Sequence, residues 1–343
     1  MPLQHAVEEA VRAAIAEDRS FGDLLPSLMD ASRTASPAEM TAALPRLTEG
    51  IAQAPPNLGG WLAVISGAWI ENGADPAPVG PALVQRITEV TAAALAFGNA
   101  WTEATGGEPP PDMQEEQPSQ RAVDTVGPVL GDGAVVTMMA WFALPQYAMA
   151  GCTLLQMAPG LRASLGDRDL HLRAAGEASR YLGQMEHYQA LLRVLDGERL
   201  LVLDRASRQG WTVTIGGIGD NFQLHMLLGG ALIGRPGGLT GERPAPEILA
   251  CFLNADAPPG PPIVSSPWNL VDAHGEWIWN EGVPADIPAV NGTRVVVIDP
   301  PSYNRTFPAG RRFPLMPATL RVDGMHLPED LGAWWPNIKP ATR

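Results

Sequence analysis

The residue types best suited to chemistry gather in the stretch WNLVDAHGEWIWNEG at 268–282. It places three tryptophans beside three acids and two asparagines. Indole rings can stack on a sugar or attract a cation, and carboxylates can act as acids, bases or ligands. We therefore expect a binding or catalytic surface here. Its candidate residues are Asp272, Trp277, Trp279, Asn280 and Glu281.

The stretch has the pattern of a β-hairpin whose two-residue turn is His274-Gly275. In that register Asp272 lies opposite Trp277, and directly opposed residues share a face of the hairpin. One face then carries Trp268, Leu270, Asp272, Trp277, Trp279 and Glu281. A shift of one residue would exchange the faces of one strand relative to the other.

Two interpretations of this face stay open. On a binding surface, the two carboxylates would stand roughly 13 Å apart at about 3.3 Å per residue, too far for glycoside hydrolysis, which needs about 5–9.5 Å. In a buried face packed on helices, Asp272 would instead need an arginine partner, because a buried carboxylate is costly without one.

A second group of candidates follows the strand-like segment WTVTIGGI. The turn GGIGDN at 216–221 leads into a helix for which Asp220 is placed as the N-cap. Such a turn can bind phosphate, but a capping carboxylate competes for the same amides, which favours a capped turn. Asn221 and His225, four residues apart, share a helix face and could hold a substrate or position a general base.

The loop DPPSYNRTFPAGRRF at 299–313 supplies arginines near the end of an expected strand, together with Tyr303. Arginine forks suit carboxylates and phosphates. The simpler alternative is that Arg305, Arg311 and Arg312 pair with the carboxylates of the protein itself. We include Arg305 among the candidate ligand-binding residues.

The sequence predicts neither a metal site nor a cofactor. Asp167 and His171 share a helix face, as do Glu177, Tyr181, Gln184 and His187 on the following helix. However, a metal needs three or four converging ligands, and no HExxH or paired Glu-x-x-His motif is present. A GxSxG nucleophile motif is absent as well.

Helical periodicity dominates the elements that would position these residues. Apolar residues recur at helical spacing in 5–20, 37–54, 58–71 and 78–101. A proline-rich, charged segment then argues for an exposed linker. We expect a helical domain at 1–104, a linker at 105–121 and an α+β domain at 122–335, with helices over 133–196 and strands and loops over 199–324.

Strand patterns are confined to the later part of the chain. ERLLVLDRAS and WTVTIGGI predict a hairpin joined by RQG, and TRVVVIDP predicts a further strand. The expected class is α+β, with an α-helical N-terminal two thirds and an antiparallel or mixed sheet in the C-terminal third.

The stretch 134–158 has no charged residue and is long enough to span a bilayer. Its proline, glutamines and alanines weaken its hydrophobic character, and flanking arginines are sparse. We therefore expect two buried helices, broken near Leu144-Pro145, with a membrane span as the alternative.

Composition limits the classes of partner. The net charge of −14 repels phosphate backbones, so nucleic acid is not an expected partner. Of 23 basic residues only Lys339 is a lysine, which with abundant alanine, glycine and proline is typical of bacterial genes of high GC content. The N-terminus has no basic region before an apolar run, so a cytoplasmic location is expected.

No assembled catalytic signature is present, and we expect a bacterial cytoplasmic protein that binds a protein partner or a small molecule without catalysis. An immunity, resistance or accessory factor fits this expectation. The alternative is a hydrolase or transferase whose pocket lies between the helices and the C-terminal strands. Its catalytic candidates are His225, Asp272 and Glu281; the ligand-binding candidates are Asn221, His225, Trp277, Trp279, Asn280 and Arg305.

Overall fold

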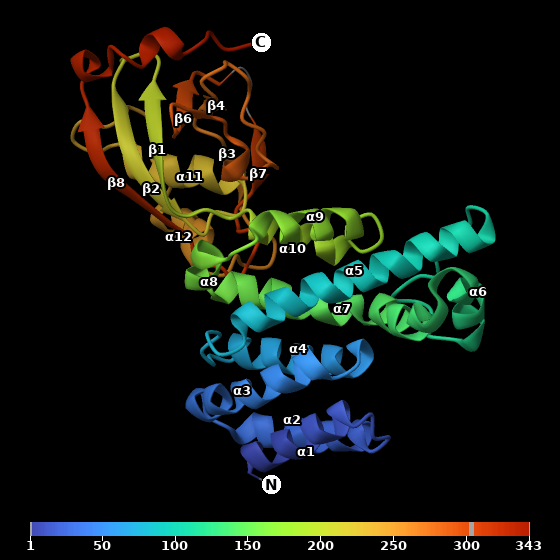
Figure 1. Cartoon of the computed structure of the whole chain (residues 1–343). Coiled ribbons are helices and arrows are strands. Elements are labelled where there is room, and N and C mark those ends of the chain that lie inside the picture. Colours follow the sequence, from blue (N-terminus) through green and yellow to red (C-terminus); the bar gives the residue numbers. More distant parts are fainter. Residues whose placement is uncertain (1, 302–304, 343) are drawn as a thin grey trace. The chain divides into compact units, whose positions relative to one another are not determined.

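The computed structural model describes residues 2–301 and 305–342 (Figure 1). Contacts between residues divide the chain into two compact units, Met1–Leu192 and Arg193–Arg343, here called unit 1 and unit 2. Unit 1 is helical, and unit 2 contains a mixed β-sheet with few helices. The expected α+β class is confirmed.

Unit 1 consists of helices joined by short connections, apart from the longer segment between α5 and α6. Over the described residues these are α1 (Leu3–Ile15), α2 (Phe21–Thr34), α3 (Pro37–Gln53), α4 (Pro56–Glu71), α5 (Gly80–Thr105), α6 (Gln120–Leu130), the 3₁₀ turn η1 (Gly131–Gly133), α7 (Ala134–Met157), α8 (Pro159–Ser164), α9 (Arg168–Ala178) and α10 (Gly183–Leu192).

The segment expected as a linker, 105–121, lies inside unit 1. It is largely exposed, as expected, but Met113 is buried and the Trp141 indole N–H donates to the Pro111 carbonyl at 2.9 Å. Helix α5, which precedes the segment, packs on α7, which follows it. The helices on both sides therefore belong to one compact unit that extends to Leu192.

Helix α7 differs from the expectation of two helices broken near Leu144-Pro145, because it continues through Pro145. A proline inside a helix removes one backbone hydrogen bond and disfavours the helical conformation before it. Here α4 and α5 pack along α7, and Trp141, Leu144 and Tyr147 are buried. Tertiary packing outweighs the local preference.

The stretch Gln120–Met157, which joins α6, η1 and α7, has the length and apolar composition of a membrane span, and 39% of its most apolar window is buried within the protein. Length and composition alone are weak evidence for a membrane span, because the core helix of a folded unit meets the same criteria.

Unit 2 contains a sheet, two α-helices and several short turns. Its described elements are β1 (Asp196–Asp204), β2 (Gly210–Gly216), α11 (Asn221–Leu232), α12 (Pro246–Leu253), β3 (Ile263–Ser265), β4 (Asn269–Val271), η2 (Pro284–Asp286), β5 (Ala289–Val290), β6 (Thr293–Asp299), β7 (Thr306–Pro308), β8 (Thr319–His326), η3 (Pro328–Leu331) and η4 (Trp335–Asn337).

The main sheet has the strand order β4-β6-β1-β2-β8, with β5 paired to β6, while β3 and β7 form a separate antiparallel pair. Strands β1 and β2 form the predicted hairpin, and TRVVVIDP forms β6. Strand β6 runs parallel to β1, whereas β4 is antiparallel to β6 and β8 is antiparallel to β2. The sheet is therefore mixed, as expected.

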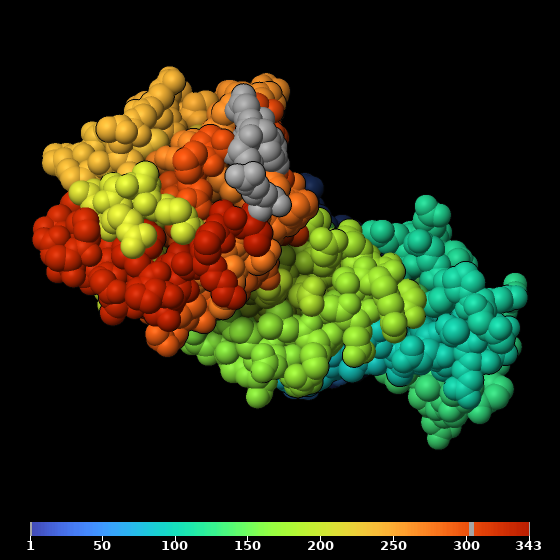
Figure 2. Space-filling view, turned by 90° about the horizontal axis from the view of Figure 1, so that it is seen from above, coloured from blue at the N-terminus to red at the C-terminus, as the bar shows by residue number. Residues whose placement is uncertain are grey.

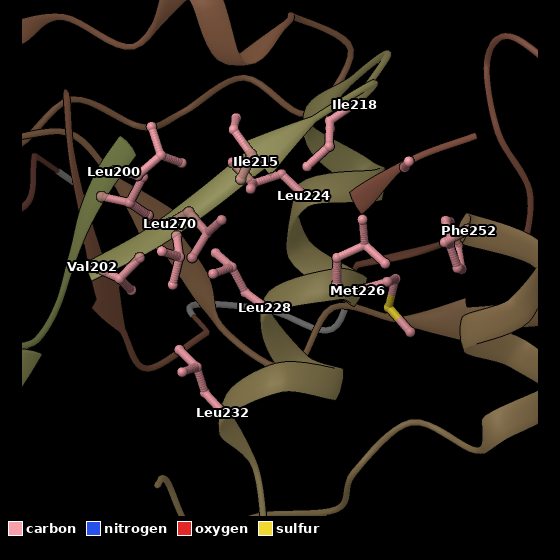
Figure 3. Packing of buried hydrophobic residues seen from close by; sticks show 14 of the residues in the cluster. Leu200, Val202, Ile215, Ile218, Leu224, Met226, Leu228, Leu232, Phe252 and Leu270 are labelled. Atoms are coloured by element: carbon pink, nitrogen blue, oxygen red, sulfur yellow. The ribbon is translucent and has the colours of Figure 1, made fainter. Parts of the chain in front are cut away.

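The central strands are buried on both faces. Leu200 and Val202 of β1 point into one apolar cluster, and Leu201 and Leu203, which alternate with them, point into another. The first cluster packs the sheet on α11, whose Leu224 and other apolar side chains face the strands in Figure 3. This packing fixes α11 against the sheet and thereby positions its functional side chains.

The second cluster covers the opposite face with the C-terminal segment, including Leu331, Trp335 and Ile338. The turn between β1 and β2 contacts this C-terminal segment through two arginines. Arg208 lies over the Trp335 ring at 3.9 Å, and Arg205 donates to the Lys339 carbonyl at 3.1 Å. In Figure 2 the turn, in yellow, lies against the C-terminal segment, in red.

Two helical glycines test the packing of unit 1. A Cβ on Gly98 of α5 would lie 2.7 Å from the Trp141 ring, whereas one on Gly22 of α2 would meet nothing within 4 Å. We expect Gly98→Ala to destabilise unit 1 by about 1–3 kcal/mol through overpacking. The control Gly22→Ala should stabilise it by up to about 1 kcal/mol through helix propensity. Urea unfolding measures both; equal effects of the two substitutions would contradict the close α5–α7 packing.

Candidate functional site

The candidate site begins at the N-terminus of α11. Asp220 accepts a hydrogen bond from the Gln223 amide at 2.8 Å, so the predicted N-cap is confirmed. The Asn221 amide donates to the carbonyls of Asn280 and Gly282, both at 3.0 Å, and the Phe222 amide donates to Asn280 at 3.2 Å. Protein acceptors thus take the free amides of the first turn. The turn at 216–221 is a capped turn, and the amides of Asn221, Phe222 and Gln223 at the helix start already have protein acceptors.

These hydrogen bonds also bring α11 to the segment after the tryptophans. The Asn221 side-chain amide donates to the Trp279 carbonyl at 2.7 Å. One turn further along the same helix face, His225 lines a small cavity with Ser266, Trp277, Asn280 and Arg305. His225 of the predicted helix face and four residues of the tryptophan stretch, Trp268, Asn269, Trp277 and Asn280, therefore converge with Arg305.

The cavity is small and polar. It leaves about 10 Å³ for a water centre, which is room for about one water molecule. Buried polar atoms around it have no hydrogen-bond partner among the described residues. They are His225 Nδ1 and Nε2, Ser266 Oγ and Asn280 Oδ1; Asn221 Oδ1, one helical turn before His225, is unpaired as well but Asn221 does not line the cavity. Buried polar groups are almost always paired, so this concentration needs an explanation.

The His225 imidazole is neutral. Burial lowers the pKa of His225 to about 3, and the positive charge of Arg305 lowers it further. The Asn280 side chain opposes this shift, but no atoms of the two side chains meet hydrogen-bond geometry. A neutral imidazole offers one donor and one acceptor. A group with so low a pKa is a weak base at neutral pH. The ring is therefore better suited to hydrogen-bonding a ligand than to removing a proton from one.

Arg305 lines the cavity and lies among three aromatic rings. Its guanidinium carbon lies 4.9 Å from the Trp277 ring centre, 5.6 Å from that of Trp279 and 5.4 Å from that of Phe222. Its nitrogen donates to both oxygens of Glu281, at 2.9 and 3.1 Å. The cation–π positions of both rings are thus occupied by the protein's own arginine. We call Trp277, Trp279, Glu281 and Arg305, with the His225 cavity, the Trp–Arg site.

The two tryptophans of this site are exposed, Trp277 by 36% and Trp279 by 59%. Indole rings usually bury most of their surface. The rings contact each other with centroids 6.2 Å apart at an angle of 70°. Of the two interpretations of the stretch, the structure favours an open surface at Trp277 and Trp279 over a buried aromatic face.

The expected register of the hairpin is wrong by one residue. Val271, rather than Asp272, pairs with Trp277, and the turn contains three residues, Ala273 to Gly275. Gly275 adopts φ of +83°, a left-handed conformation typical of the last residue of such turns. The face predicted to carry both Asp272 and Trp277 therefore does not exist.

Asp272 is not part of the Trp–Arg site. It is buried, and its Oδ1 accepts hydrogen bonds from the amides of His274 and Glu276 at 2.8 and 3.0 Å. Neither an arginine nor the two exposed indoles contact its carboxylate among the interactions of the described residues. Asp272 therefore stabilises the turn. The predictions that it is a catalytic candidate and that it shares a face with Trp277 are corrected accordingly.

The remaining arginines of the 299–313 loop pair with protein groups. Arg311 lies 3.7 Å from Asp256 and donates to the Leu253 carbonyl at 3.2 Å, and the charge of Arg312 acts on Asp220. Together with the Arg305–Glu281 pair, this agrees with the simpler alternative for the loop. Tyr303, expected beside these arginines, lies outside the described residues.

Sequence reasoning missed Ser266 and Phe222 as members of the site. Ser266 precedes the tryptophan stretch in SSPWN and is aligned by its amide, which donates to the Arg305 carbonyl at 3.0 Å. Phe222 directly follows Asn221 and reaches the guanidinium from the neighbouring side of α11. A serine beside a candidate hairpin is a weak signal, because only the fold brings it to His225.

The helical polar strip of unit 1 gives no metal site among the described residues: no group of three or more potential ligands converges there. His171, which was paired with Asp167 as a further candidate, is buried, and its Nδ1 lies 2.6 Å from the Thr88 hydroxyl of α5. This pair joins two helices.

Comparisons with known proteins give no relative: no protein-family model, no curated protein and no solved structure matches the chain. The assignment of function therefore depends on the site itself.

Asp220 provides a test of the electrostatics at the start of α11. Burial raises the pKa of Asp220 to about 6 from 3.8, although the Gln223 amide and Arg312 oppose the shift. The folded protein then holds a proton that the unfolded chain releases, so stability falls as pH rises from about 4 to 6. At 1.36 kcal/mol per pKa unit the loss is at most about 3 kcal/mol, reduced by solvent screening of this partly exposed residue.

We expect Asp220→Asn, which keeps an N-cap acceptor, to be more stable than the natural protein at pH 8 and equal to it at pH 4. Urea unfolding at a series of pH values measures the difference. If the variant loses stability at pH 8, the Asp220 carboxylate stabilises α11 and its pKa is not raised.

Asp272 provides a test of the corrected register. We expect Asp272→Ala to destabilise unit 2 by about 1–3 kcal/mol, because two amides of the turn lose their acceptor. Asp272→Asn keeps one side-chain oxygen and should cost less than half as much. If the two substitutions are equally mild in urea unfolding, Asp272 does not hold the turn.

Proposed function

We propose that this protein binds a small molecule without transforming it, and that the ligand is a neutral, hydroxyl-bearing compound such as a sugar unit. The observation that carries the proposal is the set of unpaired polar atoms buried around His225, beside the exposed Trp277, whose ring contacts that of Trp279. Leaving such atoms unpaired costs stability. A binding site accepts that cost when the ligand supplies the missing partners.

The chemistry of the cavity favours a hydroxyl group. Asn221 Oδ1 and Asn280 Oδ1 only accept hydrogen bonds, whereas the Ser266 hydroxyl and the neutral His225 ring can donate and accept. A hydroxyl group both donates and accepts, and it is about the size of the single water molecule that fits the cavity. The rest of the ligand would then lie outside, over the indole rings.

The charges of the site argue against a cationic ligand. Arg305 already occupies the faces of both indoles and is held by Glu281. An incoming cation would have to displace it against the repulsion of like charges. The apolar face of a sugar ring needs only an exposed indole surface, which Trp279 offers.

The test is isothermal titration of the full chain with a panel of monosaccharides and their disaccharides. We expect Trp279→Ala to weaken binding about two- to tenfold, because an aromatic contact is worth about 0.5–1.5 kcal/mol. Trp61→Ala is the matched control, since Trp61 is 47% exposed but belongs to unit 1. If no sugar binds, or if both variants bind alike, the proposed ligand class is wrong.

His225→Phe separates binding from folding. The substitution replaces both unpaired ring nitrogens with carbon, so we expect the melting temperature to rise by a few degrees while sugar binding is lost. It should also remove a loss of stability between pH 6.5 and 3, where the unfolded chain, but not the folded protein, protonates His225. Unchanged sugar affinity in this variant would contradict the proposal.

A hydrolase or transferase is the second candidate, because Ser266 and His225 line the same cavity. A serine nucleophile needs a base within hydrogen-bond reach, and Ser266 Oγ has no partner among the described residues. Hydrolysis of p-nitrophenyl esters or glycosides that disappears in Ser266→Ala would favour this candidate over binding alone. A cytoplasmic immunity, resistance or accessory role remains part of the proposal and depends on the identity of the ligand.

A further inference from the structure

Unit 2 contains a second pocket, of about 500 Å³, next to the start of α11. We call it the arginine pocket and define it by Asp220, Phe222, Phe307, Arg311 and Arg312. Phe222 and Phe307 form one wall, with ring centroids 4.6 Å apart. Prolines and alanines make up much of the remaining lining. The pocket has the size and the mainly apolar character of sites for small molecules.

The Arg311 guanidinium is the main charge of this pocket and is poorly neutralised. Its side chain is only 5% exposed, yet its one hydrogen bond among the described residues goes to the Leu253 carbonyl at 3.2 Å. Its carboxylate partner, Asp256, stands 3.7 Å away and is itself 95% exposed. An exposed partner at this distance contributes little. A guanidinium has five N–H donors, and among the described residues Arg311 has the Leu253 carbonyl and the distant Asp256 as its printed partners.

The other two charged groups of the pocket act on each other. The positive charge of Arg312 favours the ionised form of Asp220, whose carboxylate also accepts the Gln223 amide. This leaves Arg311 as the cation with a weak counter-ion. A buried cation attracts an anion, and a guanidinium binds a carboxylate best through two parallel hydrogen bonds.

We propose that the arginine pocket binds a small monocarboxylate with a flat apolar body. The carboxylate pairs with Arg311 in place of Asp256, and the body lies against Phe222 and Phe307. A carboxylate provides the charge that Arg311 lacks, and an aromatic or aliphatic body matches the apolar lining. The pocket is distinct from the Trp–Arg site, because Arg305 and His225 do not line it.

The probe is sodium 3-phenylpropionate, titrated calorimetrically into the full chain, with the neutral 3-phenylpropanamide as its matched control. We expect the carboxylate to bind at least tenfold more tightly than the amide. Arg311→Gln should abolish this preference. Trp279→Ala should leave it unchanged, which distinguishes this pocket from the Trp–Arg site.

Asp256→Asn tests the pocket without disturbing the fold, because Asp256 is almost fully exposed. The substitution removes the carboxylate that competes with the ligand, so we expect affinity for 3-phenylpropionate to rise about two- to fivefold. Glu329→Gln, which neutralises an exposed acid elsewhere in unit 2, is the control and should leave affinity unchanged.

The proposal is overturned if 3-phenylpropionate does not bind at millimolar concentration, or if folded Arg311→Gln binds it like the natural protein. If Arg311→Gln does not fold, Asp256→Asn decides: a rise in affinity that Glu329→Gln does not share supports the pocket, and unchanged affinity overturns it.

Discussion

The hydrogen bonds at the N-terminus of α11 hold the functional part of unit 2 together. The first turn of a helix has unpaired amides that must find acceptors. Asp220 accepts one of them, and the carbonyls of Asn280 and Gly282 accept others. These few bonds join the helix to the segment that carries the exposed tryptophans. His225 and Asn280 consequently line the same cavity.

Two different pockets lie next to the N-terminal part of α11. On one side His225 lines a small cavity together with Arg305 and Asn280. On the other, Asp220 and Phe222 border a wider and mainly apolar pocket. Phe222 belongs to both, since it contacts the Arg305 guanidinium and lines the arginine pocket. The two arginine-bearing sites can therefore differ in the ligands they select, because their polar groups and available space differ.

Local patterns in the sequence predict much of this arrangement. Asp220 as the N-cap, the shared face of Asn221 and His225, and the β1–β2 hairpin each depend on residues close together in the chain, and the structure has all three. The hairpin register was not predictable in the same way. Two- and three-residue turns fit His274-Gly275 equally well, and the choice follows from the bonds that Asp272 makes to the turn amides.

Other features depend on tertiary contacts that no short pattern contains. The continuity of α7 through Pro145 comes from the packing of α4 and α5 along it. Ser266 reaches the cavity only because its amide bonds to the Arg305 carbonyl. Arg305 was a candidate from its residue type, but its position over Trp277 depends on β3 pairing with β7, which brings the two loops together.

The central claim is that the neutral His225 ring forms hydrogen bonds with the bound ligand. Nitrogen-15 NMR of the histidine rings tests it most directly, with the His225 signals assigned by their loss in His225→Phe. The account predicts a neutral imidazole at pH 7 whose ring nitrogens both shift when a binding sugar is added. A protonated ring at pH 7, or ring signals that do not change at saturating ligand, would contradict it.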